Sequence, residues 1–90
     1  MNKNELVDAV SERTGLAKSD AARAVEAVLG AVTDALRAGD TVALSGFGSF
    51  VTKTRAARTG RNPRTGESLA IPASRAPAFK AGKGLKDALN

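Results

Sequence analysis

Cysteine, histidine, tryptophan and tyrosine are all absent from this sequence of 90 residues. Without cysteine no disulfide can staple the fold, and without cysteine and histidine neither a zinc site nor a haem site is expected. We predict no metal and no cofactor. No carboxylates cluster beside a nucleophile either, so the sequence predicts a protein that is not an enzyme.

Aromatic residues are nearly absent as well, since Phe47, Phe50 and Phe79 are the only three. A domain of this size buries only roughly 60–65% of the surface that its unfolded chain exposes. Three aromatic rings therefore leave a thin core for a monomer. Small domains in this position depend on disulfides, metals or oligomerisation. Because the first two are excluded, we expect a dimer.

No targeting signal and no long apolar run is visible. The N-terminus passes directly into an amphipathic pattern with acidic residues, unlike a signal peptide. No apolar run approaches the ~20 residues that a membrane span needs. We therefore expect a soluble protein of the cytoplasm.

The basic charge is concentrated in the second half of the chain. Residues 1–45 carry five basic and seven acidic side chains, whereas residues 46–90 carry nine basic and two acidic ones, which gives the net charge of +5. A pI near 10.3 with the cations in one half is typical of nucleic-acid binding. An anionic membrane surface is the alternative that the charge alone leaves open.

The segment 55–67, RAARTGRNPRTGE, is the most informative part of the sequence. A turn is predicted at its middle, because Pro63 after Asn62 fixes φ near the value that a turn requires and Gly66 accepts a positive φ. Almost none of its side chains could be buried, so the segment predicts a projecting hairpin that grips a polyanion. Its arginines recur at every third position, at Arg55, Arg58, Arg61 and Arg64.

The first half of the chain predicts two helices. The first runs from about Lys3 to Thr14, where Asn2 can cap its start and Gly15 can end it in the left-handed conformation. The second runs from about Lys18 to Ala38, with Ser19 as a candidate cap. A three–four spacing gives the second helix a broad apolar face, formed by Ala21, Ala22, Val25, Val28, Leu29, Val32, Ala35 and Leu36.

Beyond the second helix, which Gly39 can end, the hydrophobic period changes to that of strands. Val42 and Leu44 alternate with small and polar residues, and a second strand leaves from Ser49 toward the arm. After the tip, a strand from Ser68 to Ala73 is predicted to return as an edge strand, because its proline cannot donate to a ladder.

A short third helix is predicted from about Gly82 to Leu89, with Leu85, Ala88 and Leu89 facing inward. Gly84 weakens this helix by roughly 1 kcal/mol relative to alanine, so the helix should depend on packing. Before it, the phenylalanines at 47 and 50 are assigned to the core in preference to base stacking, because they lie beside the strands and not among the arginines.

Four segments together resemble the bacterial histone-like HU / integration host factor family. They are GFGSF at 46–50, the arginines at 55 and 58, GRNPRTG at 60–66 and PAFKAGK at 77–83. The combination is specific and follows the family in order and length over the whole chain. Ala17 and Gly84 depart from the usual pattern, where serine and alanine are common, so the second and third helices should be held less firmly.

The resemblance implies an α+β fold in one domain, residues 1–90, that forms an intertwined homodimer. Residues 1–45 would form the helical dimerisation base, a small antiparallel sheet would form a saddle, and residues 52–76 would form one of two protruding β-ribbon arms. Residues 81–90 would form the C-terminal helix. The dimer core would consist of Val25, Leu29, Val32, Leu36, Leu44, Phe47, Phe50 and Phe79.

The resemblance also implies a DNA-binding surface. Pro63 would be the wedge that inserts between base pairs from the minor groove, a mechanism known for this family. Other DNA contacts would come from Lys3, Lys53, Arg55, Arg58, Arg61, Asn62, Arg64, Arg75, Lys80, Lys83 and Lys86.

The function implied is that of an architectural protein of the nucleoid, which wraps, bends and compacts double-stranded DNA with little dependence on sequence. DNA that is already bent, nicked or gapped should bind more tightly, because part of the unstacking energy is avoided. A sequence-specific bending factor of the integration host factor type is the alternative. RNA binding and a heterodimer with a paralogue are further expectations, whereas a membrane partner is not expected.

Overall fold

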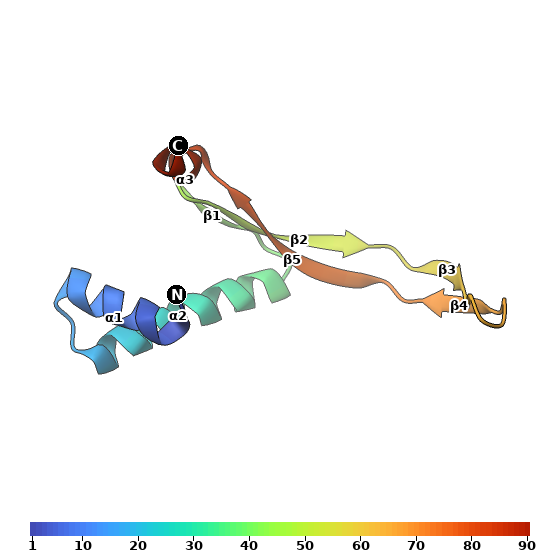
Figure 1. Ribbon diagram of the computed structural model, residues 1–90, viewed down its shortest axis with the longest axis horizontal. Helices are drawn as coiled ribbons and strands as arrows, with labels where there is room; N and C mark the ends of the chain where they lie inside the picture. The colour runs from blue at the N-terminus through green and yellow to red at the C-terminus, as the bar shows by residue number, and fades with distance from the viewer.

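The computed structural model describes residues 1–90, which form an elongated chain with extents of 60 × 30 × 26 Å. Figure 1 shows the helices at one end and a long two-stranded arm at the other. None of the three helices combines the length and the apolar character that crossing a membrane requires. The elements in order are α1 (Lys3–Thr14), α2 (Lys18–Arg37), β1 (Val42–Leu44), β2 (Gly48–Arg55), β3 (Arg58–Arg61), β4 (Ser68–Ile71), β5 (Ser74–Ala81) and α3 (Lys83–Leu89).

Helix α1 has the bounds and the caps that the sequence predicts. The side-chain oxygen of Asn2 accepts a hydrogen bond from the Glu5 N–H at 2.8 Å. At the other end Gly15 has φ 75°, and its N–H donates to the Ser11 carbonyl. Both ends of the helix thus have their free backbone groups partly satisfied by local hydrogen bonds.

The start of α2 differs from the prediction. The backbone turns into the helix at Ala17, which makes no side-chain capping bond. Ser19 as the cap was wrong, because this residue already lies inside the first helical turn. The helix therefore begins without the hydroxyl acceptor that stabilises most helix starts by ~1 kcal/mol.

The end of α2 is a Schellman motif. Gly39 has φ 82°, and its N–H donates to the Leu36 carbonyl at 3.0 Å, while the Asp40 N–H donates to the Ala35 carbonyl at 2.9 Å. Glycine at this position confirms the predicted stop. The last helical residue is Arg37, one residue earlier than expected.

Strands β1, β2 and β5 form an antiparallel sheet with β2 in the centre. Phe50 pairs with Val42 on one side and with Phe79 on the other. The Phe79 ring centroid lies 4.9 Å from that of Phe50 and 5.5 Å from that of Phe47. The phenylalanines thus pack on one another away from the arm, although Phe47 is 47% and Phe79 41% exposed in the single chain.

The arm consists of two ribbons in series. Strands β2 and β5 stay paired as far as Arg55 and Ser74. Residues 56–57 and 72–73 then leave the ladder, and β3 and β4 form a separate two-stranded sheet. The predicted return strand over 68–73 was too long, since it ends at Ile71 where Pro72 removes a ladder donor.

Helix α3 runs from Lys83 to Leu89, close to the prediction. Leu85 is half-buried as expected, but Ala88 and Leu89 are exposed, so their predicted inward position was wrong for the single chain. A Cβ on Gly84 would overlap the Gly46 carbonyl oxygen. Glycine thus lowers helix propensity at this position but lets α3 lie directly on the turn between β1 and β2.

The chain alone has almost no closed core. Only Ala21, Val25 and Gly48 are buried, and the radius of gyration is 19.1 Å. A compact domain of this length has a radius of about 12 Å. The predicted thin core is therefore confirmed, and large apolar side chains remain exposed at Leu6, Val28, Leu29, Leu44, Phe47, Leu69, Phe79 and Leu89.

Gly48 is the glycine whose replacement we expect to disturb the sheet. A Cβ at this position would lie 2.5 Å from the Lys80 carbonyl oxygen and 2.5 Å from Cζ of Phe79. Because β5 would have to move, Gly48→Ala should lower the free energy of unfolding by about 1–3 kcal/mol in a thermal melt.

Gly30→Ala provides the matched control for this substitution. A Cβ on Gly30 meets nothing within 4 Å, and alanine in a helix interior stabilises by up to about 1 kcal/mol. Melting temperatures that move in the same direction for both variants would contradict the steric argument.

Candidate nucleic-acid interface

The strand register gathers cations on one face of the β2–β5 ribbon. Ser49 pairs with Lys80, Lys53 with Ala76, and Arg55 with Ser74. Directly opposite residues share a face, and every second residue along a strand returns to that face. We call this surface the basic face; it is formed by Ser49, Val51, Lys53, Arg55, Ser74, Ala76, Ala78 and Lys80.

The other face of the same ribbon is turned toward α2. Phe50, Thr52 and Thr54 alternate with the basic-face residues of β2. The Thr52 hydroxyl donates to the Leu36 carbonyl at 3.4 Å, which fixes this face against the end of the helix. The basic face therefore points away from α2 and is free to meet a ligand.

The basic face includes two hydroxyl groups that the sequence reasoning missed. Ser49 and Ser74 stand in the same alternation as Lys53 and Arg55. Serine hydroxyls are common donors to phosphate oxygens. The alternation of β2 could have identified Ser49 from the sequence, whereas Ser74 becomes apparent only from its pairing with Arg55.

The arm tip is a turn shaped by Asn62. Its N–H donates to the Glu67 carbonyl at 2.8 Å, and its carbonyl accepts from the Gly66 N–H at 2.8 Å. Its side-chain oxygen accepts from the Arg64 N–H at 2.9 Å. With φ 75° at Gly66, the predicted turn is confirmed. These bonds leave Pro63 exposed at the end of the arm.

The arm arginines do not lie on one face. Arg58 pairs with Ile71 and Arg61 pairs with Ser68. A spacing of three residues in a structure of period two sends these two arginines to opposite faces of the β3–β4 ribbon. The arm therefore carries cations on both sides.

The ion pairs divide the basic residues into two groups. In the helical half, Lys18 lies 3.4 Å from Asp8, Arg37 lies 3.4 Å from Asp34, and Arg23 and Asp20 form a further pair. None of the nine basic residues in 46–90 forms an ion pair. The positive charge of the sheet and arm is thus unneutralised.

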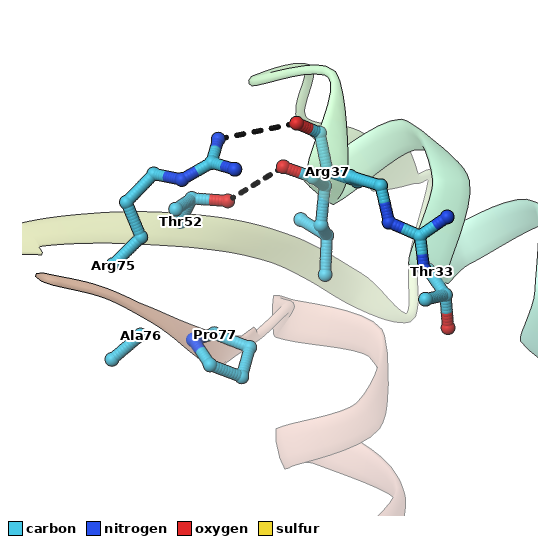
Figure 2. A pocket seen from close by; sticks show the side chains of 7 residues that line it. Thr33, Arg37, Thr52, Arg75, Ala76 and Pro77 are labelled. Atoms are coloured by element: carbon cyan, nitrogen blue, oxygen red, sulfur yellow. Dashed lines mark hydrogen bonds between the residues drawn. The ribbon is translucent and has the colours of Figure 1, made fainter.

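Lys3 and Arg75 differ from the other predicted DNA-binding residues. Lys3 is paired with Glu26 of α2. Arg75 lies on the α2-facing side of β5, opposite Thr54, and its guanidinium donates to the Arg37 carbonyl at 3.2 Å. Figure 2 shows this side chain turned toward the helix end. The structure therefore does not bring these two residues together with the basic face.

Lys83 and Lys86 extend the positive surface in the other direction. Both are exposed on α3, which lies at the end of the sheet far from the arm tip (Figure 1). From the tip through the basic face to α3, the second half of the chain presents unpaired cations along its whole length.

An α+β chain with a projecting ribbon, an exposed proline at its tip and a row of unpaired cations is typical of a nucleic-acid-binding protein. Residues 1–90 match the family described as bacterial DNA-binding protein. The chain is 61% identical over 89 residues to the DNA-binding protein HU of Geobacillus stearothermophilus, covering 99% of both chains. It is 57% identical to the DNA-binding protein HU-beta of Pseudomonas aeruginosa, covering 100% of both.

A solved structure supports the same conclusion. The fold is similar to that in the HU–DNA cocrystal structure from Anabaena, with a TM-score of 0.85, 48% identity, and coverage of 99% of this chain and 97% of that one. This chain therefore belongs to the bacterial DNA-binding protein family of the HU type. It is an architectural DNA-binding protein with the α+β fold of that family.

Proposed function

We propose that two copies of the chain form an intertwined homodimer, which holds double-stranded DNA between two arms and bends it with little dependence on sequence. The observation that carries the proposal is the contrast between paired cations in the helical half and unpaired cations in the sheet and arm. The site of action is the nucleoid in the bacterial cytoplasm, and no catalytic step is ascribed to the chain.

The dimer follows from the apolar surface that one chain leaves open. A hollow of about 250 Å³ between α1 and α2 is lined only by apolar side chains, and Val28 at its rim is 60% exposed. Leu6, Val28 and Leu29 are all exposed there, and apolar side chains gathered at a surface mark an interaction site. A second copy offers the same face in return, as a two-fold interface requires. The hollow is lined by Leu6, Val10, Ala24, Val25, Val28 and Leu29.

In this dimer residues 1–45 form the base, residues 52–76 form each arm and residues 81–90 form the C-terminal helix. The exposed Leu44, Phe47 and Phe79 would then lie against the partner copy, together with Leu29 of the base. The half-buried Val32, Leu36 and Phe50 and the buried Val25 complete the proposed core.

DNA would lie on the basic face and between the arms. Each lysine or arginine that neutralises a phosphate releases a condensed counterion, so the affinity should fall steeply with salt. Arg58 and Arg61 point to opposite sides of the ribbon. A ribbon seated in the minor groove therefore presents a cation to each wall of the groove, and arginine favours this narrow electronegative space.

Pro63 would act as the wedge. It is exposed at the tip, and the three hydrogen bonds of Asn62 hold the turn that presents it. A proline is rigid and has no N–H to desolvate, so it can enter between two base pairs. Unstacking costs a few kcal/mol per step, which the added contacts of the bent duplex offset.

The wedge predicts a specific loss in Pro63→Ala. The wild type should bind a nicked duplex more tightly than the intact duplex of the same sequence, and this preference should shrink toward unity in the variant. The slope of log affinity against log salt should stay unchanged, because no charge is removed. Competition titrations with both duplexes measure both quantities.

Pro72→Ala is the control, because it removes a proline from the same arm without touching the tip. It should keep the preference for the nick. If Pro63→Ala also kept the full preference, the wedge would be excluded and the tip would be an ordinary turn.

The relatives named above are HU proteins, which favours binding with little sequence dependence over the integration host factor type. The arm contains no aromatic residue, and aromatic stacking is the usual means of holding single-stranded bases. Duplex DNA is therefore the preferred ligand over RNA.

A heterodimer with a paralogue stays a prediction.

A further inference from the structure

We propose that Arg75 and Thr52 are positioning residues, which bind the last carbonyls of α2 and set the angle at which the arm leaves the body. The inference rests on the proposed DNA bending. It removes Arg75 from the set of phosphate ligands and assigns control of the bend to a pair of hydrogen bonds on the face away from DNA.

The end of α2 offers carbonyl oxygens that can accept hydrogen bonds from outside the helix. The last four carbonyls of a helix have no partner within the helix, and a cation near them is favoured by the helix dipole. The Arg37 carbonyl accepts from the Arg75 guanidinium at 3.2 Å, and the Leu36 carbonyl accepts from the Thr52 hydroxyl at 3.4 Å. We call these two bonds the α2 anchor.

The two donors come from the two strands that form the base of the arm. Thr52 belongs to β2 and Arg75 to β5, and both lie on the α2-facing side of the ribbon. Figure 2 shows both side chains turned toward the helix end, whereas the Arg37 side chain points away toward Thr33. The anchor therefore connects both strands of the arm to one point of the helical body.

The anchor lies at the base of the arm, so it affects the direction of the whole arm. The β2–β5 ladder continues only to Arg55 and Ser74, one pair beyond Thr54 and Arg75. Everything farther out, including the break at 56–57 and the tip, projects away from the helices (Figure 1). A small rotation at the anchor moves the tip and its proline through a much larger distance.

The local surroundings also distinguish the anchor from a phosphate site. The anchor borders a hollow of about 350 Å³ that is lined in part by Thr33, Ala76 and Pro77 and opens beside α2. The Arg75 guanidinium would have to leave the helix carbonyl to reach DNA on the basic face. The cations that attract the duplex, such as Lys53 and Lys80, lie on the other side of the sheet.

The test compares Arg75→Ala and Thr52→Val with Lys53→Ala, a control on the basic face. For each full-length protein, the distance between the labelled ends of a duplex is measured by energy transfer, and the salt slope of the affinity is measured in parallel. Arg75→Ala and Thr52→Val should both move the end-to-end distance toward that of free DNA at an unchanged salt slope. Lys53→Ala should reduce the slope by about one for each phosphate that the protein no longer neutralises.

The opposite pattern would overturn the inference. If Arg75→Ala lowers the salt slope as Lys53→Ala does, while Thr52→Val bends DNA like the wild type, Arg75 is a phosphate ligand. Should Arg75→Ala fail to fold by circular dichroism, Thr52→Val alone decides, because it removes no charge and preserves the side-chain shape. A wild type that does not bend DNA would instead refute the proposed function and not the anchor.

Discussion

Replacement of Arg58, Arg61 and Arg64 by glutamine in one variant is expected to weaken binding to duplex DNA by about 10³-fold at moderate salt. The dimer would lose six cations, none of which has an acidic partner in the chain. The salt slope should decrease by about five, since each neutralised phosphate contributes roughly 0.9 to it. Titration at several salt concentrations measures both effects.

The matched control carries the same change of net charge in the helical half. It replaces Arg13, Arg23 and Arg37 by glutamine, of which two are ion-paired within α2. The side chain of Arg37 does not take part in the α2 anchor, so its replacement leaves that pair of hydrogen bonds intact. The control should keep most of its affinity. Equal losses in the two variants would mean that binding depends on net charge alone and not on the arm.

Val28→Asp is expected to abolish the folded dimer. In the single chain this side chain is 60% exposed, and a substitution at such a position in a monomer usually changes stability by less than about 0.5 kcal/mol. In the dimer the carboxylate would be buried in an apolar interface twice, at an effective penalty of several kcal/mol per ion. Sedimentation and circular dichroism should therefore show loss of the dimer together with loss of helix.

Asn4→Asp on the exposed surface of α1 is the control for this variant. It adds a charge of the same sign and should leave both the mass and the melting curve of the wild type unchanged. A Val28→Asp protein that melts like the wild type would show that α2 is not covered by a partner copy. The exposed phenylalanines would then require another explanation.

The sequence predicted those features that depend on local chemistry. Asn2 and Gly15 set the ends of α1 through a side-chain acceptor and a positive φ, and both can be identified from residue type and spacing. The tip turn was equally accessible, because Asn62 and Gly66 satisfy it by bonds within five residues. Ser19 failed as a cap because a hydroxyl inside the first turn cannot substitute for the missing one at Ala17.

The features that the sequence did not predict depend on pairing between distant segments. The spacing of the arginines could be read from the sequence, but the placement of Arg58 and Arg61 on opposite faces follows only from the strand pairing. The place of Arg75 on the α2-facing side follows from its pairing with Thr54, which no local pattern reveals. The sequence also could not show which surface α3 would pack against, so the predicted inward position of Leu89 was wrong in the single chain.

The most direct test of the account is a competition titration of the wild type over a salt series, with intact duplex, its nicked form, a scrambled duplex and duplex RNA as ligands. An architectural protein that grips phosphates and kinks DNA should show a steep salt slope, no response to scrambling, a preference for the nick and weaker binding to RNA. Strong loss on scrambling would instead indicate a sequence-specific bending factor. No binding to any duplex at low salt would contradict the account as a whole.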